Sequence, residues 1–428
     1  MLLRATDQEI LKYRTGRVAR ESRPLPRRWQ HRRRRISRIT GAGIYTFGGK
    51  VAMMGGGAVV APSGAQGLFN YLQNLSYSSP PYFLIGQDTD CYTSGATVPW
   101  NSFSSGSTSA ANAQVTGTGG ATYVPAIMSC YVQGPANGGA GTQASVTSGS
   151  TKLVVELVNS WGAAGGIPEV HCFLNNPSGA NPLDTSGLDG GQDLSANAFA
   201  SGNNCLTNGT TANTNLNNNL NNICALLTQF NYQCIFRPIH ESNGNWYWWS
   251  WGSTGGIGSG GAGATAANYV ALYQYIYNYI TFTKGITNLV WAYNLNDQYG
   301  GPSEGVNYLA GFPGTSYCQL ATIDTYNDTP GTTGANSTGA YTAYIAGGAA
   351  TVGMPIGICE LGNGSATDGS DGTPYQNLLA DIKSHMPLCC FARISCQTWA
   401  IALNGASNIT ALMTDSAVIN RPALPPLL

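Results

Sequence analysis

Eight short apolar segments, separated by helical patterns and polar loops, follow one another after residue 80. We expect a strand in each: residues 82–87, 123–130, 166–173, 233–238, 288–293, 319–324, 355–359 and 393–399. Two apolar helical stripes lie between them, formed by Tyr269, Leu272, Tyr273, Ile276 and Ile280 and by Leu153, Leu157 and Trp161. Strand then helix, repeated eight times, predicts an α/β fold of the (β/α)8 TIM barrel type. A doubly wound sheet is the alternative, but it would ordinarily have fewer strands, and the chain has no Gly-rich phosphate-binding fingerprint.

Long loops rich in Gly, Asn, Ser and Thr interrupt this pattern. They cover residues 102–120, 134–150, 178–222, 252–263, 329–339 and 362–372. Predicted strands of one barrel lie on both sides of each loop, so we interpret the loops as surface insertions rather than as linkers between domains. They also explain why only 9% of the residues are charged while 56 are glycine, a composition that excludes a coiled coil. No apolar run approaches the roughly 18 residues of a membrane-spanning helix.

Charge is divided unevenly along the chain. Residues 1–50 hold 14 of the 20 basic and 3 of the 20 acidic residues, which leaves 6 basic and 17 acidic residues beyond them. Six scattered cations cannot form the basic face that a nucleic acid needs, so no nucleic-acid partner is expected. Arg32–Arg35 precede a Gly-rich apolar stretch, residues 41–61, that ends in small residues. Residues 1–62 are therefore expected to be an export signal resembling the twin-arginine type, with a basic disordered tail or a misassigned start codon as alternatives.

This interpretation makes residues 63–420 the catalytic barrel of a secreted protein. All 11 cysteines lie after residue 90, which suits an oxidised, exported body better than a cytosolic one. Cys205 and Cys224 flank an Asn- and Thr-rich segment that a disulfide between them would close, although connectivity is not fixed by sequence. The chain has no C-x₂-C pair, and its four histidines lack the spacing of a zinc site, so no metal is expected.

The segment from Phe236 to Trp249 follows the fourth predicted strand and carries Arg237, His240 and Glu241. The carboxyl end of a barrel strand is where the active sites of this fold lie. A glutamate buried beside aromatic walls has a raised pKa, as a general acid requires. Three indoles that offer stacking surfaces for sugar rings follow it: Trp246, Trp248 and Trp249. The alternative, an aromatic-rich turn of the core, would not need an arginine, a histidine and a glutamate together.

A second candidate carboxylate, Glu360, ends the seventh predicted strand and precedes Leu361 and Gly362. It lies 119 residues after Glu241, which is three strand–helix units of about 40 residues and fits strands four and seven. Carboxylates on those strands can face each other across the barrel mouth about 5 Å apart, the separation found in retaining glycosidases. Taken alone, the Glu-Leu-Gly motif is also compatible with a solvated loop glutamate.

These residues carry a family resemblance. The motif Arg237-Pro238-x-His240-Glu241-x-x-Gly244-x-Trp246-x-Trp248-Trp249 resembles the signature of glycoside hydrolase family 26, the β-mannanase family. Further similarity occurs in residues 85–87, 165–167, 175–177, 289–291, 312–317 and 323–327. The resemblance implies that Glu241 is the acid/base and Glu360 the nucleophile. It also implies the substrate-binding residues: His240, which also contacts the nucleophile, Tyr326, which positions it, Trp399 beneath the −1 sugar, and Arg237, Asp324, Trp246, Trp248 and Trp249.

The implied activity is endo-acting, retaining hydrolysis of β-1,4-mannosidic linkages in mannan or glucomannan by a secreted monomer without a cofactor. Phe173 stands where the family usually has a sugar-contacting histidine, and Cys130-Tyr131 and Gln319 replace common acidic positions. His171 would point along the same strand face as Phe173 and is a candidate substitute, with a buried core histidine as the alternative. These departures leave open a hydrolase of mixed-linkage β-glucan or β-1,3-xylan. A non-catalytic carbohydrate-binding surface protein is a further alternative, but it would not need two rim glutamates.

Overall fold

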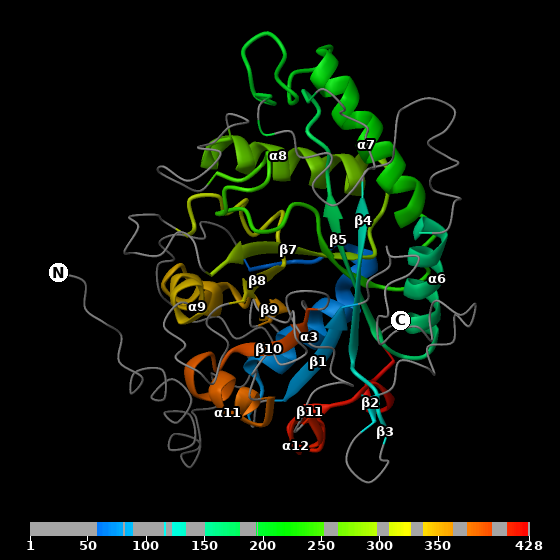
Figure 1. Cartoon of the computed structure of the whole chain (residues 1–428), viewed down its shortest axis with the longest axis vertical. Coiled ribbons are helices and arrows are strands. Elements are labelled where there is room, and N and C mark those ends of the chain that lie inside the picture. The colour runs from blue at the N-terminus through cyan, green and yellow to red at the C-terminus, as the bar shows by residue number, and fades with distance from the viewer. Residues whose placement is uncertain are drawn as a thin grey trace, which may run out of the picture. The chain divides into compact units, whose positions relative to one another are not determined.

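Eight parallel strands close into a barrel in the computed structural model (Figure 1). The structure describes residues 58–79, 82–88, 115–116, 122–133, 150–179, 194, 196–251, 264–297, 308–326, 337–362, 375–395 and 409–426. The barrel strands are β1 (Phe83–Asp88), β4 (Ile127–Gln133), β5 (Ile167–Phe173), β6 (Cys234–Arg237), β7 (Leu289–Asn296), β8 (Leu320–Thr325), β9 (Ile356–Leu361) and β10 (Cys389–Ile394). Each pairs with the next in this order, and β10 pairs with β1, which confirms the predicted TIM barrel. A short β11 (Val418–Ile419) adds to β1, while β2 (Val115–Thr116) and β3 (Thr122–Tyr123) form a separate antiparallel pair.

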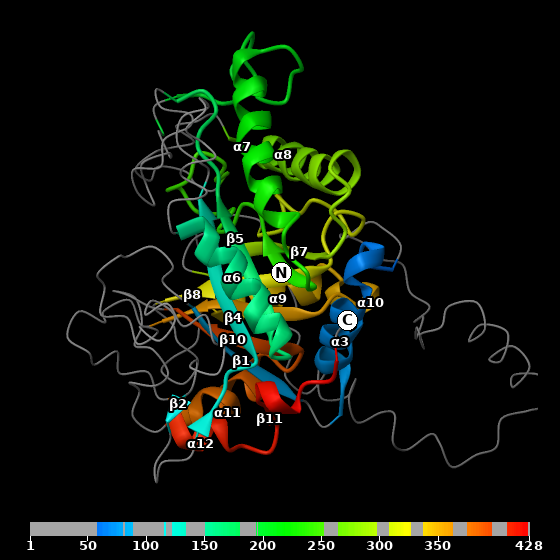
Figure 2. The ribbon, with the colours of Figure 1, turned by 90° about the vertical axis from the view of Figure 1, so that its right-hand side faces the viewer.

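Helices lie around the strands, as Figures 1 and 2 show. They are α3 (Gln66–Tyr77), α6 (Ser150–Ala163), α7 (Thr211–Leu227), α8 (Ala266–Asn278), α9 (Ser337–Ala346), α10 (Ala349–Val352), α11 (Tyr375–His385) and α12 (Ile409–Met413), with 3₁₀ turns at Ser63–Ala65 and Arg421–Ala423 and a π turn at Tyr279–Thr283. The apolar stripe predicted for residues 269–280 is buried, as expected of an amphipathic helix. Among the helices that the structure describes, none combines the length and apolarity needed to cross a lipid bilayer.

The eighth strand differs from its prediction. It runs from Cys389 to Ile394 rather than over residues 393–399, so Trp399 follows the strand and lies outside the described residues. All six residues of this strand are buried. A parallel strand covered on both faces reads as a continuous apolar run, which here is Cys389–Ala392. Arg393 looks like the start of the strand in the sequence but lies inside it, buried among carboxylates.

One predicted loop is partly wrong. Residues 178–222 were expected to be irregular, but α7 begins at Thr211 and takes up the last part of the segment. Its asparagines are poor helix formers, which hides the buried apolar stripe of Leu216, Leu220 and Ile223. The Thr210 hydroxyl caps the helix by accepting from the backbone N–H of Asn213 at 3.0 Å. Most of the other predicted loops lie outside the described residues.

The disulfide between Cys205 and Cys224 that the sequence left open does not form in the structure. The Asn213 side chain, near the start of α7, donates to the Cys205 carbonyl at 2.8 Å, so Cys205 lies at that end of the helix. Cys224 is eleven residues beyond Asn213 in the same helix, roughly 16 Å away at about 1.5 Å per residue. A disulfide requires Cα atoms within about 7 Å. The nine cysteines in the described part of the chain are all buried free thiols.

The described chain begins at Ala58, so the expected export segment, residues 1–62, falls almost wholly outside it. Val59 and Ala61 are buried in the core. The backbone N–H of Val59 donates to the carbonyl of Val352 at 3.3 Å. Residues just before the first helix thus already pack on the barrel.

Two local features of the sheet determine where Arg393 and Glu360 lie. In β1, Gly86 is in register with Ile127 and Arg393, and an added Cβ would lie 2.9 Å from Ile127 Cβ and 3.0 Å from Arg393 Cγ. The missing side chain leaves room for the arginine. Between β8 and β9 the register shifts, so that Asp324 faces Glu360. A bulge of this kind re-aims a side chain, and here it brings two carboxylates together.

Candidate active site

Glu241 follows β6 in a strained turn. Its φ is 49°, in the left-handed region that is rare for residues other than glycine. Its backbone N–H donates to Asn294 Oδ1 at 2.7 Å, which holds the turn. Its carboxylate is buried and accepts two short hydrogen bonds, from Asn296 Nδ2 to Oε1 and from Trp246 Nε1 to Oε2, both 2.6 Å.

Glu360 projects from the end of β9 and is also buried. Its Oε1 accepts a hydrogen bond from Arg237 Nη2 at 2.8 Å and forms an ion pair with Arg393 Nη2 at 3.2 Å. Its Oε2 accepts from the Tyr326 hydroxyl, which is also 2.9 Å from Ser395 Oγ. Each oxygen of this carboxylate therefore has its own fixed partners.

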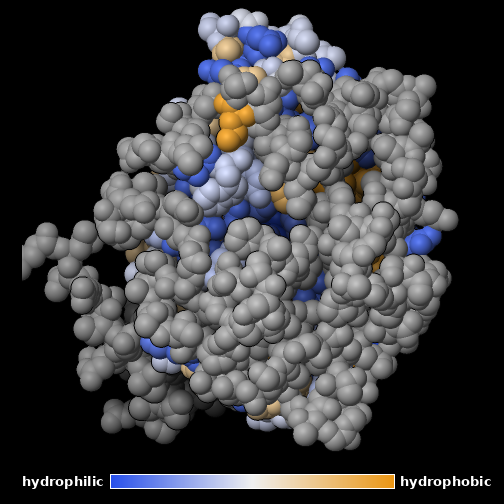
Figure 3. Space-filling model, in the orientation of Figure 1, coloured by the Kyte–Doolittle hydropathy of each residue, from blue (hydrophilic) through white to orange (hydrophobic). Residues whose placement is uncertain are grey.

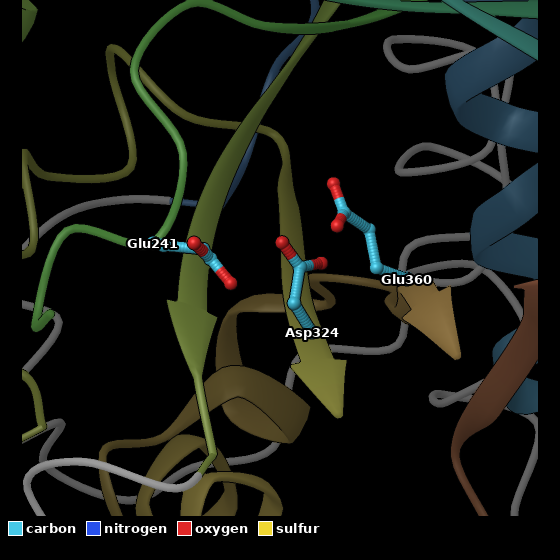
Figure 4. A group of neighbouring side chains, drawn as sticks. All are labelled: Glu241, Asp324 and Glu360. Atoms are coloured by element: carbon cyan, nitrogen blue, oxygen red, sulfur yellow. The ribbon is translucent and has the colours of Figure 1, made fainter. Parts of the chain in front are cut away.

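Glu241, Asp324 and Glu360 come from neighbouring parts of the barrel and lie close together (Figure 4). One carboxylate oxygen of each lies within 4.8 Å of the others. Retaining glycosidases hold their two carboxyl groups about 5–5.5 Å apart, whereas inverting enzymes need about 6.5–9.5 Å. The closest oxygens of Glu241 and Glu360, within 4.8 Å of each other, are nearer to the retaining than to the inverting separation.

The two glutamates have opposite electrostatic environments. Burial, assisted by the nearby charge of Glu360, raises the pKa of Glu241 to about 7. Burial alone would also raise the pKa of Glu360, but Arg237 and Arg393 outweigh it and hold that pKa well below its usual range. At neutral pH Glu360 is ionised, while Glu241 is partly protonated. Paired groups with pKa values pushed apart are the mark of an acid and a nucleophile.

Arg237 connects three carboxylates of the site through its guanidinium group. It donates from Nε to Glu169 Oε1 at 2.7 Å, from Nη1 to Asp324 Oδ2 at 2.9 Å and from Nη2 to Glu360. Burial, with the charge of Glu360, holds the pKa of Asp324 well above its usual range. The carboxylate cluster resembles a cation site, but a guanidinium already occupies the space between Asp324 and Glu360, so we assign no ion to it.

His240 lies beside the glutamates within an aromatic cluster. Its Nε2 and the Tyr247 hydroxyl are 3.1 Å apart, while its ring meets Phe173 edge-on at 4.9 Å and His171 at 5.3 Å. Burial and Arg237 lower the pKa of His240 to about 3, so the ring is neutral. His240 thus contacts the tyrosine of its own loop, and Phe173 lies at the position where the family resemblance leads one to expect a histidine.

The predicted indole platforms separate into two groups. Trp246 is partly exposed and bonds directly to Glu241. Trp248 and Trp249 are both 0% exposed and donate to the carbonyls of Leu174 and His240. They pack behind the site and offer no ring face to a sugar, which corrects the expected platform role of these two residues. Trp399 lies outside the described residues.

Sequence reasoning missed several residues that hold the two glutamates. They are Glu169, Asn294, Asn296, Arg393 and Ser395. A signal existed for most of them: polar or charged side chains inside or ending otherwise apolar strands, where burial is costly without a partner. In Figure 3, hydrophilic residues (blue) are visible near the middle of the molecular face.

Comparison with known proteins decides the family. A model described as glycosyl hydrolase family 26 matches residues 60–422. The chain belongs to this family. A mannan endo-1,4-beta-mannosidase of Bacillus subtilis is 32% identical over 178 residues, 41% of this chain and 44% of the relative. The match thus spans less than half of that relative's length.

Solved structures of the family share the fold. The mannanase BCman of Bacillus subtilis is 20% identical, with a TM-score of 0.60 covering 85% of this chain and 95% of that one. A modular endo-beta-1,4-mannanase of Cellulomonas fimi is 18% identical, with a TM-score of 0.62 covering 88% and 79%. An Endoglucanase H of Acetivibrio thermocellus is also similar, 36% identical over 93 residues, 21% of this chain and 9% of that relative.

Proposed function

We propose that the protein is an endo-acting, retaining glycoside hydrolase that cleaves β-1,4-mannosidic linkages in mannan or glucomannan. The observation that carries this proposal is the pair Glu241 and Glu360, with oxygens within 4.8 Å and pKa values shifted in opposite directions. A non-catalytic sugar-binding protein would have no use for a carboxylate held ionised beside one whose pKa is raised to about 7.

In the first step, an ionised Glu360 oxygen attacks the anomeric carbon and the glycosidic C–O bond breaks. The protonated Glu241 gives its proton to the departing oxygen, so the leaving sugar departs as a neutral alcohol. The product is a glycosyl ester on Glu360 with inverted configuration. Burial of Glu241 supports this step, because it favours the protonated acid near pH 7.

In the second step, Glu241 acts as a base. Esterification removes the negative charge of Glu360, which is one cause of the raised pKa of Glu241. Its hydrogen bonds from Asn296 and Trp246 favour the carboxylate, so its pKa falls when the ester forms. Glu241 then takes a proton from water, the hydroxyl attacks the anomeric carbon, and Glu360 leaves. Two inversions give net retention.

Mannan is the preferred substrate because relatives named mannan endo-1,4-beta-mannosidase and mannanase recur among the similar proteins. The second candidate is β-glucan or a related β-glycan. Two observations favour it: the similarity to an endoglucanase and Phe173, which offers no hydrogen bond to a sugar hydroxyl. Since an intact polysaccharide does not cross a membrane, we propose that the protein acts outside the cell, as a monomer.

The test is release of reducing sugar from mannan, glucomannan, mixed-linkage β-glucan and β-1,3-xylan. Mannan or glucomannan should be cleaved fastest, with early products of retained anomeric configuration by NMR. Glu360→Ala and Glu241→Ala should each lose several orders of magnitude in kcat, and azide should restore activity of Glu241→Ala on an activated aryl glycoside. Cleavage of β-glucan or xylan with no cleavage of mannan would transfer the assignment to the second candidate. Products of inverted anomeric configuration would reject the roles of the two glutamates.

A further inference from the structure

A second arginine approaches the proposed nucleophile. Only six basic residues lie beyond residue 50, and two of them, Arg237 and Arg393, are fully buried inside the barrel. A guanidinium removed from water needs compensating partners, so each buried arginine is a costly feature. Arg237 belongs to the motif discussed above. Arg393 belongs to no motif of the sequence and lies in β10, on the other side of Glu360.

Arg393 is held by carboxylates from three other strands. Its Nη1 lies 2.9 Å from Asp88 Oδ2 on β1, its Nε 3.5 Å from Glu169 Oε2 on β5, and its Nη2 3.2 Å from Glu360 Oε1 on β9. These contacts are ion pairs by distance, and none of the three guanidinium nitrogens has a hydrogen-bond partner with good geometry. The end of Arg393 nearest the site therefore places its positive charge beside one oxygen of Glu360.

The two oxygens of Glu360 differ in what holds them. Oε1 faces two guanidinium groups, from Arg237 and Arg393. Oε2 has a neutral hydroxyl, that of Tyr326, which also lies 2.9 Å from Ser395 Oγ. Ser395 follows Arg393 by two residues, so the two side chains leave the chain on the same side at the end of β10. The end of β10 therefore acts on both oxygens of Glu360: Arg393 contacts Oε1, and Ser395 contacts the Tyr326 hydroxyl that bonds to Oε2.

We propose that Arg393 and Ser395 are positioning residues for the reaction, an inference that rests on the function proposed above. Arg393 fixes Oε1 as the oxygen that does not react, and Oε2 forms the bond to the anomeric carbon. As this bond forms, the glycosidic C–O bond breaks and the leaving oxygen takes the Glu241 proton. The esterified Oε2 is a poorer acceptor, and the Tyr326 hydroxyl then donates to Ser395 Oγ instead. No further atom or electron is transferred.

The charge on Glu360 depends on every group that faces it, so these must stay constant between variants. They are Arg237 on β6, Asp324 and Tyr326 on and after β8, Glu169 and His171 on β5, His240 and Glu241 after β6, and Asp88 on β1. Changing Arg393 or Ser395 keeps all of these residues, but Arg393 also acts on the pKa values of Asp88, Asp324 and His240, so the direct readout of the contact is the pKa of Glu360 itself.

The experiment measures Glu360 directly. The chain has seven glutamates, so carbon-13 NMR of protein labelled at glutamate carboxyls can follow each one, with Glu360→Gln assigning the signal. Arg393→Met should raise the pKa of Glu360 by at least one unit, and Arg393→Lys should restore part of that shift. The matched control is Arg421→Met, which removes a guanidinium stacked 4.6 Å over Trp161. It should leave the Glu360 pKa and the activity unchanged.

Kinetics on the polymer that the wild type cleaves complete the test. Arg393→Lys should lower kcat at least tenfold with KM within twofold, and move the acidic limb of kcat/KM to higher pH. Ser395→Ala should lower kcat about tenfold without moving the Glu360 pKa, and Ser395→Thr should recover it. An unchanged Glu360 pKa in Arg393→Met, or in Arg393→Gln if the first variant does not fold, would overturn the role of Arg393. Wild-type kcat in Ser395→Ala would overturn that of Ser395.

The same measurements separate this inference from the proposed function. The NMR titration needs no substrate, so a shifted Glu360 pKa together with no hydrolysis of any glycan would reject the function and support the contact with Arg393. Hydrolysis with an unshifted pKa would reject the role of Arg393 and leave the function standing.

Discussion

The indole N–H of Trp246 lowers the pKa of Glu241, and with it the alkaline limit of activity in the proposed mechanism. It donates to the buried Glu241 carboxylate at 2.6 Å, and such a bond favours the ionised form. Trp246→Phe keeps a ring and removes the donor. A hydrogen bond to a charged group is worth about 1.5–3 kcal/mol, and one pKa unit corresponds to about 1.4 kcal/mol. Because the hydrogen bond from Asn296 remains, we expect a loss near the low end of that energy range. The pKa of Glu241 should therefore rise from about 7 to roughly 8.

The direction of the shift in the Glu241 pKa can be read from the pH profile of kcat/KM, which reports the pKa values of the free enzyme. Glu241 must be protonated for the first step, so activity is lost above its pKa, and a higher pKa moves the alkaline limb to higher pH. Glu360 sets the acidic limb, which should not move. The control is Trp161→Phe, which removes an indole N–H bonded to the Ala126 carbonyl at 3.3 Å, away from the site. An alkaline limb that stays in place or moves downward in Trp246→Phe would refute the assignment of Glu241 as the acid.

Three further changes test packing and specificity. Gly86→Ala should displace Arg393 from Glu360 and destabilise the fold by about 1–3 kcal/mol; a melting temperature and kcat equal to wild type would contradict this. Phe173→His should raise kcat/KM on mannotriose at least fivefold, roughly the effect of one sugar hydrogen bond of about 1 kcal/mol, while an unchanged value would mean that residue 173 does not face the sugar. Deletion of residues 1–57 should leave the melting temperature within about 2 °C, whereas deletion of residues 1–65 should lower it clearly, because Val59 and Ala61 pack in the core.

The barrel could be predicted because its strands are buried on both faces. All eight residues of Leu289–Asn296 are buried, and the first five of them form an apolar run long enough to recognise. Polar residues inside buried elements concealed one helix and displaced one strand boundary. The asparagines of Thr211–Leu227 concealed a helix, and Arg393 shifted the expected start of the last strand.

The two glutamates could be found because Glu241 follows a strand and Glu360 lies at the end of one, and strand ends meet at one rim. The groups that determine their protonation could not, since Asn296, Arg393 and Ser395 act through contacts between strands far apart in the chain. Nor does sequence spacing show the register shift beside Asp324, which turns Glu360 towards its partners. A buried charge in a sheet needs an opposite charge from another strand, so each charged residue within an apolar run predicts a partner elsewhere. Because only six basic residues lie beyond residue 50, this rule singles out Arg393, which directly follows the apolar run Cys389–Ala392, as a residue whose partners must be carboxylates of other strands.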